Sequence, residues 1–223
     1  MNDVQEIIKD IKSKFRLYMN GVISQSMREK GMDYKLNFGI EYSRIKEIAA
    51  GYEKNHELAQ ALWKENIREC KIMATLLQPV DSFYKDIAEI WIEDMKYPEL
   101  AEYTVMNILQ HVDYASDVVF KWIADERTYF QFCGYMLMTR LLMKGMKLNE
   151  RAEAEFLDQV FTEIEGGEPM VKKAAATALK KFAAQSKENA KMVGRQLGLL
   201  SKTANPELKL YIDEIKYDIE YCQ

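Results

Sequence analysis

Apolar residues along the chain recur at helical spacing rather than at the alternating spacing of strands. Near the start, Ile8, Ile11 and Phe15 lie three or four positions apart, which puts them on one face of a helix. This stripe breaks at Gly31 and again at Gly39, and helical spacing then resumes. The pattern therefore predicts helices separated by short turns.

The same periodicity continues to the end of the chain, where prolines and glycines interrupt it. Pro98 and Pro169 suit the first turn of a helix, since proline lacks the N–H that this turn leaves unpaired. Many of the predicted helices are about 10 to 17 residues long, and they come in pairs. Beyond residue 44 they cover residues 45–52, 58–62, 67–77, 83–94, 98–110, 113–124, 126–143, 149–166, 169–184, 187–199 and 206–222.

Paired short helices predict an all-α protein of the repeat kind, because each pair must bury its apolar face against its neighbours. We expect a HEAT-like helical-repeat solenoid, an α-α superhelix of about six antiparallel helix pairs, with a compact irregular bundle as the alternative. No linker composition divides the chain, so we expect one all-helical domain over residues 1–223. The stretch 20–37 is the best candidate for a flexible join.

Composition agrees with the helical pattern and excludes several classes of protein. Four prolines and ten glycines in 223 residues are too few for a turn-rich β protein. No apolar run approaches the roughly 18 residues of a membrane span, and the charged start MNDVQEIIKD is unlike a signal peptide. Cys70, Cys133 and Cys222 are far apart and odd in number, which predicts reduced thiols in a cytoplasmic protein.

Few residues offer metal or cofactor chemistry. Two histidines and scattered cysteines give no metal-ligand spacing, and they cannot supply a Ser-His-Asp or Cys-His set. The sequence has neither a P-loop nor the glycine-rich dinucleotide fingerprint. We therefore expect no metal, no cofactor and no membrane partner.

Charge is distributed unevenly along the chain. Residues 171–202 contain eight lysines and arginines against the single acid Glu188, a net charge of +7. The whole chain carries −4, so the remainder carries −11. A concentrated positive segment creates an attractive local field for phosphate even in an acidic protein, although a solvated helix face is the ordinary alternative.

Three segments carry a resemblance to a known family. FGIEYSRIKEIA at 38–49 is followed by ELAQALWKENIRECKIMATLL at 57–77, and VKKAAATALKKFA comes later at 171–183. Together they resemble the DNA alkylation repair family of AlkD-like DNA glycosylases. The matching positions are Phe38, Gly39, Ile45, Lys46, Ile48, Ala49, Leu62, Trp63, Glu69, Ala74, Leu76, Leu77, Lys173, Ala174, Ala178, Leu179 and Lys180.

The resemblance implies a HEAT-like α-solenoid with a concave face that binds DNA. Most of the matching positions have a structural interpretation as well. Leu62 and Trp63 at helical spacing favour a core role, Gly39 favours a turn, and Glu69 favours helix pairing or capping.

The family's implied reaction is hydrolysis of the N-glycosidic bond of an alkylated base. A cationic transition state needs a nearby carboxylate, and the resemblance places it in a Trp-x-x-Val-Asp pattern. Asp113 is therefore the candidate catalytic residue, with Leu109 in the Trp position. Asp113 could equally cap the following helix, and a rival alignment puts Glu102 in the Asp position and Pro98 in the Trp position.

Other signature positions of the family are replaced. Its Trp-x-Arg-Arg pattern would fall on residues 129–132, which contain no arginine, and Arg127 and Arg140 are the nearest arginines. A further tryptophan position, in the helix of KKAAATALKK, is occupied by Thr177. The resemblance thus implies DNA binding and leaves N-glycosylase activity open.

Two functions follow as hypotheses. The first is duplex DNA binding through a concave basic face, with phosphate contacts from Lys172, Lys173, Thr177, Lys180, Lys181, Lys187 and Lys191. The second is a non-catalytic HEAT-like scaffold for a protein or peptide partner. The acidic remainder and the 13 tyrosines and 9 phenylalanines motivate this alternative, since aromatic side chains anchor interfaces.

Overall fold

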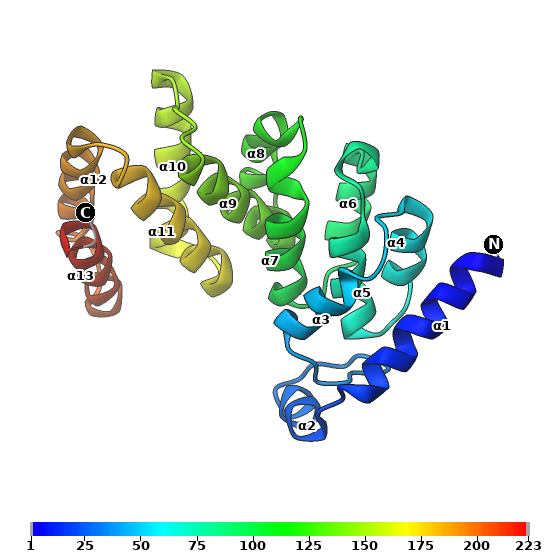
Figure 1. Cartoon of the computed structure of the whole chain (residues 1–223). Helices are drawn as coiled ribbons and strands as arrows, with labels where there is room; N and C mark the ends of the chain where they lie inside the picture. Colours follow the sequence, from blue (N-terminus) through cyan, green and yellow to red (C-terminus); the bar gives the residue numbers. More distant parts are fainter. Residues whose placement is uncertain (1, 222–223) are drawn as a thin grey trace. The chain divides into compact units, whose positions relative to one another are not determined.

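The computed structural model describes residues 2–221 of the chain, with side chains from residue 3 onward, and Figure 1 shows their helices. No strand occurs within this range, where an isolated bridge joins Leu36 to Ile67. The α-helices are α1 Asn2–Leu17, α2 Gly21–Glu29, α3 Tyr42–Ala49, α4 His56–Trp63, α5 Arg68–Leu77, α6 Lys85–Glu93, α7 Pro98–Asn107, α8 Ala115–Ile123, α9 Thr128–Met143, α10 Glu150–Gly166, α11 Pro169–Ala183, α12 Lys187–Leu200 and α13 Pro206–Tyr221. Short 3-10 helices η1 Val80–Ser82 and η2 Leu109–His111 complete them.

The all-α prediction is confirmed, and helix starts follow the expected chemistry. Asn55 and Ser186 accept hydrogen bonds from the first turns of α4 and α12, which satisfies N–H groups that a helix start leaves unpaired. Pro98 and Pro169 occupy the first turns of α7 and α11, as predicted. The prediction of a flexible join over 20–37 is wrong where α2 forms.

The chain divides into two compact units, Met1–Val112 and Asp113–Gln223. In the first unit α5 is central, since it packs against α3, α4 and α7. Nearly every residue of α5 is buried, including the charged Arg68, Glu69 and Lys71. The expectation of one domain over the whole chain stays a prediction.

In the second unit α9 and α11 pack against each other at the centre, with α8 and α10 beside them. Buried side chains surround most of α9, as expected for a helix enclosed by neighbours. Gly134 lets α8 and α9 approach closely, because a Cβ there would lie 2.7 Å from the backbone nitrogen of Ile123. Consecutive helices also pack as pairs, namely α8 with α9, α10 with α11, and α12 with α13.

Within residues 2–221, no helix combines the length and the apolar character that crossing a membrane requires. The same residues contain no group of three His, Cys, Asp or Glu side chains suited to holding a metal. Cys70 and Cys133 are buried free thiols, and burial raises the pKa of Cys70 to about 12. Cys222 lies outside the described residues.

Candidate nucleic-acid interface

Helix α11 carries most of the sequence-predicted site residues. Its apolar side, which includes Val171, Ala175 and Phe182, is buried against the second unit's core. At about 100° per residue, Lys172 and Lys181 lie on opposite sides of the helix, because nine positions separate them. The predicted residues of α11 therefore do not share a single face.

Lys173, Thr177, Lys180 and Lys181 fall within about 100° of the helix circumference. Lys173 and Lys181 are exposed, and Thr177 is half-buried. The Thr177 hydroxyl donates to the carbonyl of Lys173 at 2.8 Å. This hydrogen bond lies within α11 and does not connect the helix to another element. The outward side of α11 thus presents two exposed positive charges, Lys173 and Lys181, about two turns apart.

The other two lysines of α11 are engaged by α13. Lys180 Nζ lies 2.8 Å from the carboxylate of Asp218 in an ion pair of two half-exposed side chains. Lys172 Nζ lies 5.1 Å from the ring centre of Tyr211, whose hydroxyl donates to the Lys172 carbonyl at 3.4 Å. These contacts hold α11 against α13 and leave Lys172 and Lys180 less available to a phosphate than Lys173 and Lys181.

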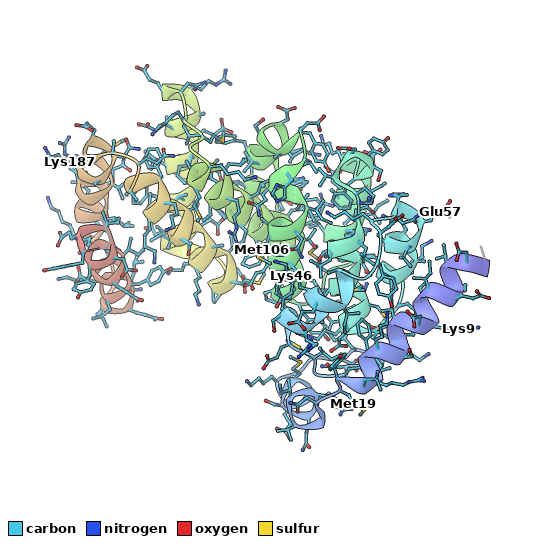
Figure 2. All side chains as sticks on the ribbon, in the orientation of Figure 1. Lys9, Met19, Lys46, Glu57, Met106 and Lys187 are labelled. Carbon is cyan, nitrogen blue, oxygen red and sulfur yellow. The ribbon has the colours of Figure 1, made fainter. Side chains whose placement is uncertain are left out.

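Helix α12 adds a second group of lysines. Lys187, at the start of the helix (Figure 2), and Lys191 one turn later are both exposed. They line a groove of about 380 Å³ between α12 and α13, together with Lys216 and Glu220. A groove with three lysines and one acid is a suitable shape and charge for a phosphate group.

Asp113, the sequence-predicted carboxylate, is exposed in the turn that precedes α8. The N-cap of α8 is Tyr114, so the structure does not give Asp113 the capping role. Leu109, in the family's tryptophan position, is completely buried in η2. The carboxylate therefore has no aromatic partner at that position. The rival candidate Glu102 is exposed on α7.

The positions that match the family's two arginines carry no positive charge in this chain. These positions hold Gln131 and Phe132 on α9. Phe132 is buried in the core and Gln131 is half-buried and uncharged, so neither brings positive charge to a ligand. Arg127 precedes the helix and pairs with Asp125 at 2.8 Å, and its guanidinium lies 3.6 Å from the centre of the Phe130 ring. The Arg127 hydrogen bonds hold the pKa of the Asp125 carboxyl below its usual value. Arg127 is thus occupied by local contacts.

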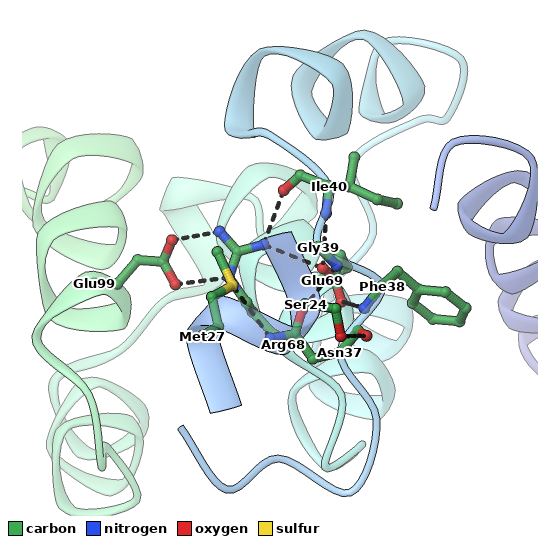
Figure 3. A network of polar contacts seen from close by, with 9 residues as sticks. All are labelled: Ser24, Met27, Asn37, Phe38, Gly39, Ile40, Arg68, Glu69 and Glu99. Carbon is green, nitrogen blue, oxygen red and sulfur yellow. Dashed lines mark hydrogen bonds and ion pairs between the residues drawn. The ribbon is translucent and has the colours of Figure 1, made fainter. Parts of the chain in front are cut away.

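The Phe-Gly turn of the first unit contacts the buried Glu69 (Figure 3). The backbone N–H groups of Phe38 and Ile40 donate to the two carboxylate oxygens of Glu69 at 3.1 and 3.2 Å. Gly39 between them has φ of +69°, and a Cβ there would lie 2.3 Å from the Asn20 carbonyl. The turn therefore requires glycine, so the predicted turn role of Gly39 is confirmed. Glu69 joins this turn to α5, which differs from the helix pairing or capping expected of it.

Arg68 completes this buried network. Its Nη1 donates to the Ile40 carbonyl at 2.8 Å and to Glu69 at 3.1 Å, and its Nε donates to Glu99 at 2.8 Å. The carboxylates raise the pKa of Arg68 against the opposing effect of its burial. Sequence reasoning missed Arg68 and Glu99, because 31 positions separate them and no local pattern relates them.

The motif residues of the first unit are thus structural. Trp63 is 4% exposed and stacks on Trp91 at 4.0 Å between ring centres, so its predicted core role is confirmed. Gly39 and Glu69 fix a turn, and the candidate ligand-binding lysines lie elsewhere, on α11 and α12. The two recognisable segments of the first unit are thus separate from these lysines, whereas the third recognisable segment, at 171–183, carries part of the positive charge.

Comparison with known proteins agrees with this architecture. The chain matches the family model described as "DNA alkylation repair enzyme" over residues 11–195. It also resembles a solved structure described as "A new family of proteins related to the HEAT-like repeat DNA glycosylases with affinity for branched DNA structures", with a TM-score of 0.75 and 18% identity over 85% of this chain and 81% of that chain. No curated protein matches. The fold is therefore of the HEAT-like helical-repeat type.

Proposed function

This chain belongs to the DNA alkylation repair enzyme family, and from that premise we propose that it binds DNA through the exposed lysines of α11 and α12. Lys173, Lys181, Lys187 and Lys191 would contact backbone phosphates. Lysine charges bind DNA by neutralising phosphates and releasing the counterions condensed on them. We call these four residues the lysine cluster.

The observation that carries the proposal is the availability of these charges. All four side chains of the lysine cluster are exposed, and none pairs with an acid among the described residues. Lys180 differs because Asp218 partly neutralises it, and Lys172 differs because it lies against Tyr211. We place Lys172, Thr177 and Lys180 at the margin of the interface, where they contribute less to binding.

The kind of DNA is part of the proposal. The solved relative is described as having affinity for branched DNA structures. Duplex arms are common to linear and branched DNA, so phosphate contacts by the lysine cluster apply to both. We propose binding to duplex DNA, with a four-way junction as the comparison substrate that shows whether branching strengthens it.

Charge reversal within the lysine cluster tests the proposal. The Lys173→Glu/Lys181→Glu and Lys187→Glu/Lys191→Glu variants should each weaken binding to a labelled 25-base-pair duplex by about tenfold or more, because each replaces attraction by repulsion at two phosphates. Fluorescence anisotropy at fixed salt gives the dissociation constants.

A matched control separates local contact from overall charge. Lys54→Glu/Lys85→Glu makes the same change in net charge at two exposed lysines of the first unit. This control should retain affinity within about twofold. Equal losses in the control and the cluster variants would mean that only net charge matters, and the proposed interface would be wrong.

Catalysis is the second part of the proposal and rests on Asp113. An exposed carboxylate can stabilise the cationic sugar of a departing base, but the aromatic wall expected beside it is replaced by the buried Leu109. We therefore propose that DNA binding is the main function and that any N-glycosylase activity depends on Asp113.

Base release from methylated duplex DNA tests this part. Asp113→Asn should lower release by about 100-fold or more, since it removes the negative charge while keeping the shape of the side chain. Asp117→Asn on α8 is a control that removes a nearby exposed-face carboxylate. Release that is unaffected by Asp113→Asn would exclude this residue from the chemistry.

A second candidate function is binding of a protein or peptide. It is favoured by the outer side of α13, where Leu210, Tyr217 and Tyr221 are 73%, 61% and 71% exposed. Apolar side chains of this size are typical anchors of an interface. Substituting all three by serine should abolish capture of a protein partner and leave DNA binding unchanged, whereas the lysine variants should do the reverse.

A further inference from the structure

A pocket of about 500 Å³ opens within the first unit, where α4, α5, α6 and the start of α7 meet. Its lining includes Tyr34, Trp63, Lys71, Trp91 and Tyr97. Pockets of this volume are typical of small-molecule sites, which combine apolar walls with a few polar groups. The lysine cluster belongs to the second unit, so the DNA-binding proposal makes no use of this pocket.

Aromatic rings form most of the pocket's walls. Trp63 and Trp91 stack with their planes 4° apart, and the rings of Tyr34 and Tyr97 lie 4.8 Å from each other. Ile90 at the opening is 61% exposed. Such walls are largely ordered by their mutual packing, so a planar ring can enter with only small side-chain rotations.

Two hydrogen-bond donors in these walls have no partner. The Tyr34 hydroxyl and the Trp63 Nε1–H are both buried and unpaired, in residues that are 8% and 4% exposed. Burial also raises the pKa of the Tyr34 phenol, which keeps its proton in place. A buried donor without a partner carries a desolvation cost of about 1–3 kcal/mol. An acceptor that enters the pocket would remove this cost once the wall side chains rotate slightly.

The charges around the pocket are also arranged for a ligand with an anionic end. Lys71 at the back is already satisfied, since it pairs with Asp94 and donates to the Trp63 carbonyl at 2.8 Å. Lys64 and Lys96 are exposed lining residues without an acidic partner among the described residues. They leave free positive charge at the opening, where Asp33 is the one unpaired acid in the lining.

From these features we infer that the pocket binds a nucleotide, with the base between the aromatic walls and the phosphate against Lys64 and Lys96. A nucleobase is planar and carries carbonyl and ring-nitrogen acceptors, which match the unpaired donors of Tyr34 and Trp63. A phosphate supplies the anion that the two lysines lack. The nucleotide can be a free molecule or an unpaired unit of a DNA strand.

Tryptophan fluorescence measures binding directly. Trp122 of the second unit is replaced by phenylalanine, so that the signal comes from Trp63 and Trp91. Titration with dAMP, dGMP, dCMP and dTMP should give saturable quenching with a dissociation constant below about 1 mM for at least one of them. Calorimetry with the unmodified protein confirms the affinity. The inference fails if none of the four quenches saturably.

A substitution at Tyr34 tests whether its hydroxyl contacts the bound nucleotide. Tyr34→Phe should weaken the nucleotide about tenfold, which corresponds to the loss of one hydrogen bond. Tyr135→Phe is the matched control, because the Tyr135 hydroxyl is also buried and unpaired but belongs to the second unit and does not line the pocket. If Tyr34→Phe binds the nucleotide as tightly as Tyr135→Phe does, the inference is overturned. Circular dichroism shows that both variants are folded.

Nucleosides, which lack the phosphate, test whether Lys64 and Lys96 bind the phosphate of a nucleotide. The Lys64→Ala/Lys96→Ala variant should bind the nucleotide about tenfold more weakly and the nucleoside with unchanged affinity. An equal loss for both ligands would contradict the assignment of the phosphate. This variant leaves the aromatic walls and their packing in place.

Two DNA probes distinguish the sources of the nucleotide. A duplex with one unpaired thymidine that quenches the combined Trp63 and Trp91 signal, when a matched duplex does not, identifies a strand nucleotide as the occupant. Saturation by free nucleotides alone identifies the free molecule. The lysine-cluster variants should lose duplex binding but keep nucleotide binding, so failure of the DNA-binding proposal is distinguishable from failure of this inference.

Discussion

At the residue scale, Glu69 shows what the recognisable sequence motif does. Its carboxylate holds the Phe-Gly turn through two backbone N–H groups and also receives a hydrogen bond from Arg68. A buried charge is stable only when such partners surround it. The motif thus has a structural role in this chain, which is to join the Phe-Gly turn to α5.

Replacing this carboxylate should destabilise the first unit. Glu69→Gln keeps one acceptor oxygen but turns an N–H donor toward a backbone donor, and it leaves Arg68 partly unpaired. We expect the free energy of unfolding to fall by about 3 kcal/mol. Urea denaturation measures it.

Glu41→Gln provides the comparison for that measurement. Glu41 is exposed at the start of α3 and makes no side-chain capping bond. Its replacement should change stability by less than about 0.5 kcal/mol. A loss below 1 kcal/mol at Glu69 would show that the network contributes little.

Some residues of the candidate sites could be predicted from the sequence, whereas others could not. The carboxylate at Asp113 and the lysines could be found from the sequence by resemblance and by charge. The Arg68–Glu99 contact could not, because it joins α5 to α7 across 31 positions. Nor could the unpaired donors of Tyr34 and Trp63, since whether a buried group has a partner depends on all neighbours at once.

At the scale of elements, hydrophobic periodicity was sufficient to locate most helices. Prolines then located two of their starts, at Pro98 and Pro169. Helix α2 was missed because only three of its nine residues are large and apolar, namely Val22, Ile23 and Met27. Asn20 nevertheless accepts a hydrogen bond from the Ile23 N–H as an ordinary N-cap. The helix is short and depends on its neighbours for stability.

The faces of helices were predicted less well than their positions. Lys172 and Lys181 were assigned to one basic strip, but helical geometry alone puts them on opposite sides of α11. The ion pair of Lys180 with Asp218 depends on where α13 packs, which no sequence pattern of α11 specifies. The cluster that remains available is therefore smaller than the sequence suggested.

The contact between α8 and α9 gives a prediction at this scale. Alanine normally stabilises a helix interior relative to glycine by up to about 1 kcal/mol. Gly134→Ala should do the opposite and lower the free energy of unfolding by about 1–3 kcal/mol, because its Cβ would lie 2.7 Å from the Ile123 nitrogen.

Gly198→Ala on α12 is the control for Gly134→Ala. A Cβ at Gly198 meets no atom within 4 Å, so this substitution should stabilise the protein by about 0.5–1 kcal/mol. Thermal unfolding of both variants shows whether each substitution raises or lowers the stability of the protein. Stabilisation of both would mean that α8 and α9 do not need the close approach.

At the scale of the whole molecule, the Phe-Gly motif and the candidate DNA-binding lysines lie in different units. The first unit, Met1–Val112, holds the Phe-Gly motif and the aromatic pocket. The second, Asp113–Gln223, holds the lysine cluster and Asp113. The uneven charge of the sequence does not follow this division, since Met1–Val112 carries a net charge of −3 and Asp113–Gln223 a net charge of −1. The basic segment 171–202, at +7, is balanced by −8 in the rest of the second unit.

Family membership and function are separable at this scale. The chain has the HEAT-like fold and the family's packing motif. The positions that the resemblance links to base release hold other residues, namely Leu109, Tyr129, Gln131, Phe132 and Thr177. Phosphate binding needs only exposed positive charge, whereas base release needs several groups in one geometry. DNA binding is therefore the function that tolerates these replacements best.

The salt dependence of DNA binding tests the central claim most directly. The logarithm of the association constant for a 25-base-pair duplex is measured against the logarithm of the salt concentration, for the unmodified protein and for Lys173→Ala/Lys187→Ala. We predict a linear fall with a slope of about −3 to −4, for four phosphate contacts, and a slope smaller in magnitude by about 2 in the variant. A slope near zero, or the same slope in both proteins, would contradict the proposal that the lysine cluster binds DNA.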